Sequence, residues 1–279
     1  MKPPRFAYAR PDEVGEALEL LAEHGEDAAI LAGGLSLMPM LNMRLAAPRL
    51  VVDIGRLSEL RYVRAHERSV EIGAGFRQAE LGRWGRLADL LPLAALALPW
   101  IGHVQTRSRG TVGGSIAHAD PSAELPLVLS TIGGEVVLQS ARGERTLEAG
   151  ELFLGPMSTA REPHELITAL RLPRAEPDAG HAFAELSLRH GDFAIVATAA
   201  DVGSQAVVFG VGGAADRPVV RRWSLDVLQA PREALEALAG EIDLLSDPQA
   251  SADYRRHLIV TLGTRVLEEA AAKREGSTA

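Results

Sequence analysis

Cysteine is absent from this chain of 279 residues. Its absence excludes disulfides, thiolate metal sites, cysteine-ligated iron–sulfur clusters and a cysteine nucleophile within the chain. Lysine is nearly absent as well, because only Lys2 and Lys273 occur, both near the ends. The chain therefore supplies neither the lysine of a phosphate-binding P-loop nor an internal lysine for a Schiff base.

Long apolar runs are also missing. The longest, Leu90 to Ile101, is interrupted by Pro92 and Pro99 and falls short of the roughly 20 apolar residues that a membrane helix requires. The net charge of -8 would repel the phosphate backbone of a nucleic acid. We therefore expect a cytoplasmic protein with no membrane insertion and no nucleic-acid partner.

The order of the predicted elements indicates an α+β fold of more than one domain. Short strands are expected near residues 6–8, 28–31 and 50–53, with a helix opening at Pro11-Asp12 between the first two. Proline, aspartate and glycine cluster at residues 173–180, which predicts a linker. Alternating stretches then predict an antiparallel sheet, followed by two helices; the strands are expected at residues 182–188, 194–200, 206–211 and 219–222, and the helices at 231–239 and 252–272.

Two glycine-rich segments carry the strongest functional signal. They read Ala32-Gly33-Gly34-Leu35-Ser36 and Thr111-Val112-Gly113-Gly114-Ser115, and each ends in a hydroxyl. Glycine adopts positive φ easily and has no Cβ to hold an anion away, so successive N–H groups in such turns form an anion site. Two turns of this kind in one chain predict a diphosphate held from two sides, as in a nucleotide cofactor. The preceding residues, 101–110, lack periodicity and predict an irregular loop.

Other motifs are interpreted as structural. Gly210 to Ala215 fits a dinucleotide fingerprint, but Asp216-Arg217-Pro218 and another strand pattern follow instead of a helix, so we predict a hairpin there. His164 lacks the second histidine of a zinc-protease motif. His103 and His118 flank the second glycine segment, and a loop histidine bonded to backbone is more common than a ligand. We predict no catalytic residue and no metal site in this chain.

The segments together resemble the FAD-binding medium subunit of molybdenum hydroxylases, the flavoprotein component of the carbon monoxide dehydrogenase and xanthine dehydrogenase group. That family's A-G-G-x-S-L-x-P stretch is matched by residues 32–39. Its long I-G-x-x-Q-x-R-x-R-G-T-x-G-G-S/N-x-A-x-A-D-P-x-x-E-L-P pattern is matched by residues 101–126. Two shorter patterns, R-x-G-D-Y/F-A and Y-R-R-x-L, are resembled by residues 189–194 and 254–258, so the likeness runs over nearly the whole chain.

The resemblance implies a fold and a set of domains. It implies a two-part FAD-binding domain of the PCMH type over residues 1–175, with subdomains of about 1–55 and 56–175. An α+β C-terminal domain of the carbon monoxide dehydrogenase flavoprotein type would follow at residues 180–279. FAD would lie extended between the parts of the chain.

The resemblance also implies which residues contact FAD. The two glycine segments would hold the diphosphate through backbone N–H groups and hydroxyls. Asp120 and Glu124 would lie near the ribityl or ribose hydroxyls, Leu166 and Ile167 beside the flavin or adenine, and Phe193 close to the isoalloxazine. Two residues depart from the family pattern: Leu35 stands where glutamine or histidine is frequent, and Phe193 where tyrosine is frequent.

The role implied is that of an oxidoreductase subunit. A small partner subunit would relay electrons through two [2Fe–2S] clusters from a large molybdopterin subunit, and the flavin would pass them to an external acceptor. A dimer of heterotrimers is the assembly implied. The alternatives are a standalone FAD-dependent oxidoreductase acting directly on a small molecule, and a scaffold that has lost FAD. The substrate of the complex and the final acceptor are left open.

Overall fold

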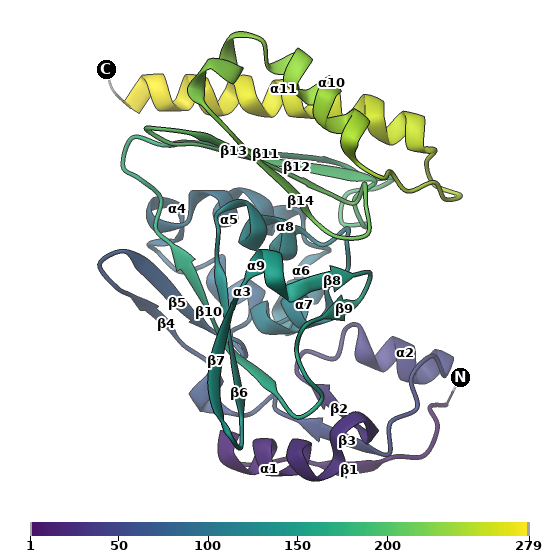
Figure 1. The fold of residues 1–279 in the computed structure, drawn as a ribbon. Coiled ribbons are helices and arrows are strands. Elements are labelled where there is room, and N and C mark those ends of the chain that lie inside the picture. Colours follow the sequence, from purple (N-terminus) through teal and green to yellow (C-terminus); the bar gives the residue numbers. More distant parts are fainter. Residues whose placement is uncertain (1, 278–279) are drawn as a thin grey trace.

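The computed structural model describes residues 2–277 and has three parts that follow one another along the chain (Figure 1). The first part is a three-stranded parallel sheet in the order β1-β3-β2, with two helices beside it. Its elements are β1 (Ala7–Ala9), α1 (Val14–His24), β2 (Ala28–Leu31), α2 (Leu37–Met43) and β3 (Leu50–Asp53). Buried Leu18 and Leu21 of α1 belong to the same core cluster as Leu50 and Val52 of β3.

The middle part is a five-stranded antiparallel sheet in the order β4-β5-β10-β6-β7. Its strands are β4 (Val63–Ala65), β5 (Ser69–Gly73), β6 (Glu135–Ser140), β7 (Gly143–Glu148) and β10 (Leu166–Pro173). The short helices of this part are α3 (Gln78–Leu81), α4 (Leu87–Leu90), α5 (Pro92–Ala97), α6 (Val104–Arg109), α7 (Val112–His118), α8 (Glu124–Thr131) and α9 (Ala149–Leu152). Of these, α7 and α9 pack on the middle sheet, whereas α5 and α8 contact the sheet of the third part. A two-stranded hairpin follows α9, formed by β8 (Phe153–Gly155) and β9 (Ser158–Thr159). Short 3-10 helices occur at Gly25–Asp27, Ser58–Leu60, Leu98–Trp100 and Leu225–Gln229.

The third part is a four-stranded antiparallel sheet in chain order, covered on one face by two helices (Figure 1). Its elements are β11 (Gly180–Leu186), β12 (Val196–Val202), β13 (Val207–Gly212), β14 (Val219–Trp223), α10 (Pro231–Glu241) and α11 (Ala252–Ser277). Side chains alternate between the two faces of a strand. Ala182 and Ala184 accordingly pack in the core beneath α10 and α11, whereas Phe183 belongs to the core of the middle part.

The predicted α+β class is confirmed, as are the four C-terminal strands and the two helices after them. Residues 210–215 lie at the end of β13 and in the turn to β14, so the hairpin interpretation is confirmed. The domain boundaries stay predictions, and residues 278–279 of the predicted C-terminal domain lie outside the described residues. No helix within residues 2–277 is long and apolar enough to cross a membrane.

Three local predictions are wrong. The helix expected to open at Pro11-Asp12 begins at Val14, and its N-cap is Glu13. The loop expected at residues 101–110 contains the helix α6. The second glycine segment is not a turn, because Gly113 and Gly114 lie in the first turn of α7. The helix α7 forms without apolar periodicity because the Thr111 side chain caps it. Its buried face also packs in the core of the middle part.

An alanine at Gly180 is expected to destabilise the C-terminal sheet. The added Cβ would overlap the backbone carbonyl of Ala270, so α11 would have to move off β11; overpacking of this kind costs about 1–3 kcal/mol. Gly240→Ala is the matched control, because nothing lies within 4 Å of the Cβ it adds to α10. Chemical denaturation gives the unfolding midpoints of the two variants. Equal midpoints would contradict the close approach of α11 to β11.

Candidate cofactor site

The two glycine segments lie against each other. A Cβ on Gly33 would lie 2.6 Å from the carbonyl oxygen of Arg109, and one on Gly114 would lie 3.8 Å from the Cβ of Ala32. The Arg77 guanidinium donates a hydrogen bond to the same Arg109 carbonyl. The missing side chain at Gly33 therefore lets two distant pieces of backbone come into contact. That these glycines also admit a phosphate stays a prediction.

The first segment offers free hydrogen-bond donors. The backbone N–H groups of residues 33 to 36 have no hydrogen-bond partner within residues 2–277. Gly34 has a φ of +79°, and Ser36 occupies the N-cap position of α2 without a capping hydrogen bond from its side chain. Consecutive free N–H groups in such a turn form a concave anion site. A diphosphate therefore fits this segment.

The second segment uses its own donors internally. The hydroxyl oxygen of Thr111 accepts the N–H of Gly114 at 3.0 Å and caps α7. The N–H groups of residues 112, 113 and 115 donate to backbone carbonyls of the protein. The prediction gave this segment the same N–H donors as the first, which is wrong. The groups that this segment leaves for a cofactor are its hydroxyls. The helix α7 also lies next to the first segment.

The residues after α7 carry two carboxylates. Ala119, with a φ of +51°, ends the helix in a left-handed conformation. Half-buried Asp120 then accepts the N–H of Ser122 at 2.9 Å through one carboxylate oxygen. Glu124 is buried at the start of α8. Burial, reinforced by the charge of Asp120, raises the pKa of Glu124 to about 7.

The remaining predicted residues lie on two other elements. Leu166 and Ile167 are buried at the start of β10, where Leu166 joins the core of the first part and Ile167 that of the middle part. Phe193 lies in the loop between β11 and β12, and its side chain is 60% exposed. The structure thus brings the glycine segments together, and it places Leu166 and Ile167 inside the protein and Phe193 on its surface.

Sequence reasoning missed the residues that hold these loops. Arg107 of α6 donates to the carbonyls of Ile101 at 2.7 Å and Gly102 at 3.0 Å, and so fixes the turn before that helix. Trp100, just before this turn, has its ring centroid 5.5 Å from that of His190 in the loop of Phe193. Arg107 is part of the long polar pattern at residues 101–126. Its role could not be predicted, because its partners are backbone carbonyls, which every residue has.

Arg255 of α11 is a second missed residue. Its guanidinium is almost fully buried and donates to the carbonyls of Ile195 and Gly213, while it pairs with Asp247 at 2.5 Å. Gly213 in turn donates its N–H to the carbonyl of Pro121 at 2.8 Å. One side chain therefore holds both the strand that follows Phe193 and the segment that follows Asp120. The pattern Tyr254-Arg255-Arg256-His257-Leu258 marked this arginine, although no role followed from the sequence.

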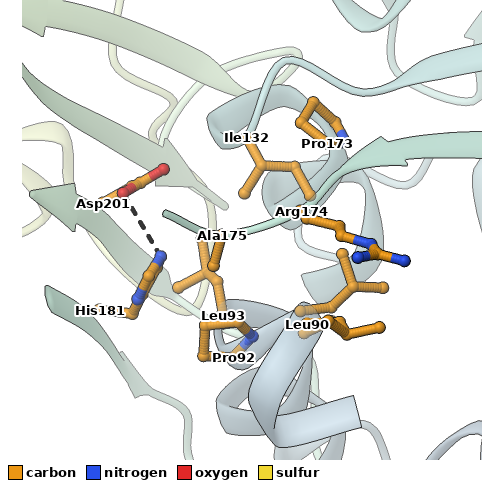
Figure 2. Close-up of a pocket in the computed structure, with 11 residues that line it drawn as sticks. Leu90, Pro92, Leu93, Ile132, Pro173, Arg174, Ala175, His181 and Asp201 are labelled. Carbon is orange, nitrogen blue, oxygen red and sulfur yellow. Dashed lines mark ion pairs between the residues drawn. The ribbon is translucent and has the colours of Figure 1, made fainter. Parts of the chain in front are cut away.

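A small, partly open cavity lies where the linker meets the third part (Figure 2). It measures about 30 Å³, enough for one water molecule, and is lined by residues of α4, α5, the linker and β11–β12. His181 and Asp201, which are register partners on β11 and β12, pair at 3.4 Å on one side of it. Burial lowers the pKa of His181 and raises that of Asp201. The cavity is too small for a cofactor.

A larger cavity of about 270 Å³ lies between α1 and the middle sheet. It contains none of the predicted cofactor residues. Glu59, Glu71 and Glu144 line it, with Arg171 paired to two of them. Three carboxylates around one guanidinium repel a diphosphate, so this cavity does not compete with the glycine segments as a nucleotide site.

Removing the guanidinium of Arg255 is expected to loosen the loops it holds. Arg255→Met leaves two buried carbonyls without their donor, and each unsatisfied buried group costs about 1–3 kcal/mol. Arg256→Met is the matched control, because the neighbouring arginine makes an exposed ion pair with Asp253, worth about 0–1 kcal/mol. Denaturation midpoints and limited proteolysis of the Phe193 loop measure the difference. Identical behaviour of the two variants would rule out this role for Arg255.

Known proteins match both halves of the chain. Residues 4–175 match the family described as the FAD binding domain in molybdopterin dehydrogenase, and residues 181–270 match the CO dehydrogenase flavoprotein C-terminal domain. The chain is 38% identical to the 6-hydroxypseudooxynicotine dehydrogenase complex subunit alpha of Paenarthrobacter nicotinovorans, over 97% of this chain and 96% of that protein. It is 33% identical to the carbon monoxide dehydrogenase medium chain of Afipia carboxidovorans, over 98% and 99%.

A solved structure agrees with these matches. Reconstituted CO dehydrogenase from Oligotropha carboxidovorans superposes with a TM-score of 0.93 at 31% identity, covering 98% of this chain and 100% of that chain. The relatives' names describe them as subunits or medium chains of larger enzymes. The resemblance seen in the sequence and its cofactor, FAD, are thereby confirmed: the chain belongs to the FAD-binding medium subunits of the molybdenum hydroxylases and is an oxidoreductase flavoprotein subunit.

Proposed function

We propose that this subunit takes electrons singly from [2Fe–2S] clusters of a small partner subunit and passes them to an external acceptor. FAD supplies this chemistry, because a flavin exchanges electrons one or two at a time, while the protein places and tunes it. The observation that carries the proposal is the row of free N–H groups at residues 33–36 beside α7. A chain without cysteine holds no such cluster itself, so the clusters belong to a partner.

In this proposal the predicted residues divide the work of binding. The N–H groups of residues 33–36 and the Ser36 hydroxyl receive the diphosphate, with the hydroxyls of Thr111 and Ser115 behind them. Asp120 and Glu124 accept hydrogen bonds from ribityl or ribose hydroxyls, since carboxylates are natural acceptors for them. Leu166 and Ile167 give apolar surface next to the flavin or adenine, and Phe193 covers the isoalloxazine.

The proposed assembly follows from the family. Substrate oxidation takes place at the molybdopterin site of a large subunit, and two copies of the resulting heterotrimer pair. The proposed domains are residues 1–175 for FAD, divided near residue 55, and residues 180–279 for the C-terminal part. Substrate identity belongs to the large subunit, and the cytoplasmic location stays a prediction.

Purification from the native source tests the assembly. We expect the chain to co-purify with a small iron–sulfur subunit and a large molybdenum subunit, with a flavin spectrum and FAD released on heating. A chain that runs alone and oxidises a small molecule directly would favour the standalone oxidoreductase. A colourless chain that takes up no FAD, alone or in its complex, would favour the scaffold.

A charge at residue 35 tests the proposed diphosphate site. Leu35 is 40% exposed and contributes only backbone to the free N–H row, so Leu35→Asp adds a negative charge there at little cost to folding. We expect FAD affinity to fall roughly tenfold, because like charges placed together oppose binding. Leu45→Asp is the control, since Leu45 is exposed and lies beyond α2. Fluorescence titration of the apoprotein with FAD gives both constants; equal affinities would place the diphosphate elsewhere.

A further inference from the structure

An arginine lies beside the free N–H groups of the first glycine segment. The guanidinium of Arg77 donates through Nη1 to the carbonyl of Arg109, the same carbonyl that the backbone of Gly33 approaches. Its Nη2 would lie 4.0 Å from a Cβ placed on Gly55, and that Cβ would lie 3.4 Å from the carbonyl oxygen of Ala32. The side chain therefore reaches from the middle part to the start of the first glycine segment.

The second glycine segment fixes the backbone from which this side chain extends. Arg77 forms an isolated antiparallel β-bridge with Thr111, the residue that caps α7. The N–H of the next residue, Gln78, donates to the carbonyl of Gly110 at 3.0 Å. The Arg77 side chain is half-buried. Because its backbone is already paired, the guanidinium loses little conformational freedom when a ligand binds to it.

The charge of Arg77 is not paired with a carboxylate. Its guanidinium forms no ion pair within residues 2–277, and its Nη2 and Nε make no hydrogen bond there. Asp53 is an acidic neighbour whose charge acts on Arg77. Its carboxylate oxygens, however, accept the Tyr8 hydroxyl at 2.5 Å and the N–H of Gly55 at 2.9 Å. The two remaining guanidinium nitrogens are thus left for a ligand.

Two further guanidinium groups act on Arg77. Arg61 pairs with Glu80 at 2.7 Å, whereas Arg109 is exposed and forms no ion pair among the described residues. Burial lowers the pKa of Arg77, and the charges of Arg61 and Arg109 lower it further. All three side chains remain charged at neutral pH, because the guanidinium pKa starts so high. An anion that binds beside them relieves their mutual repulsion.

A diphosphate carries two negative charges, whereas the N–H groups of residues 33–36 offer only partial positive charges. The chain has no lysine between Lys2 and Lys273 that could supply a full charge. We propose that Arg77 binds the FAD diphosphate, holding the Arg109 carbonyl with one guanidinium nitrogen and a phosphate oxygen with another. This role rests on the diphosphate position proposed above. The planar fork of five donors allows both contacts at once.

Titration of the full-length apoprotein with FAD tests this role. We expect Arg77→Gln to lower the affinity for FAD about ten- to a hundredfold, the effect of losing one charge-assisted hydrogen bond. The loss should shrink as salt is added, because salt screens the attraction between guanidinium and phosphate. Riboflavin, which lacks the phosphates, should bind to Arg77→Gln and to the wild type equally. Should the chain bind FAD only within its complex, the same variants are compared in the apo-complex.

Arg265→Gln is the matched control, because Arg265 is exposed on α11 and its loss changes the net charge equally. This control should follow the wild type at every salt concentration. Arg77→Lys keeps the charge, so it should bind FAD more tightly than Arg77→Gln does. It also replaces Arg77→Gln in the comparison with the wild type if that variant fails to fold, with a smaller loss expected.

Two results would overturn the role of Arg77. One is equal FAD affinity in Arg77→Gln and the wild type. The other is a loss that is independent of salt and extends to riboflavin, since Arg77 would then act only by holding the Arg109 carbonyl. Either result leaves the proposed function intact. A wild-type chain that takes up no FAD, alone or in its complex, would instead sink the proposed function, and with it any role of Arg77 in binding FAD.

Discussion

The contact between the two glycine segments is the constraint on which the rest of this site depends. Gly33 lies against the Arg109 carbonyl, and only a residue without a side chain permits that approach. The contact fixes the first parallel sheet against the helices of the middle part. The free N–H groups of residues 33–36 thereby lie next to α7, where a Cβ on Gly114 would lie 3.8 Å from the Cβ of Ala32. Binding a flexible diphosphate is more favourable when its donors are already in place.

Hydrogen bonds from arginine side chains to backbone carbonyls also hold the loops near the site in place. Arg77, Arg107 and Arg255 each direct a guanidinium at carbonyl oxygens of loops near the site. The chain has only two lysines, so arginines make these contacts. The guanidinium carries five N–H donors in a planar fork and can donate to several carbonyls at once. The loops that bear Asp120 and Phe193 consequently depend on α11, at the far end of the sequence. The C-terminal part thus supports the loops of the proposed cofactor site.

Motifs and alternation made much of this arrangement predictable. The antiparallel C-terminal sheet followed from strict period-two patterns, and the hairpin at residues 210–215 from Pro218 and the strand after it. The helix α7 was missed because glycines suggested a turn, whereas a capping threonine and tertiary packing outweigh their low helix propensity. The roles of Arg107 and Arg255 were out of reach because their partners are main-chain atoms. Glu185 of β11 was missed because nothing in a strand pattern marks a buried carboxyl whose oxygens find no hydrogen-bond partner among residues 2–277.

One feature of β10 bears on how the protein is made. Leu166 completes the core of the first part, although the other residues of that core come from positions 14 to 60. During synthesis the first parallel sheet leaves the ribosome long before β10 does. Its apolar face therefore stays incomplete until most of the middle part has been translated. Contacts so far apart in sequence slow folding, so we expect the core of the first part to reach its native packing only once β10 has joined it.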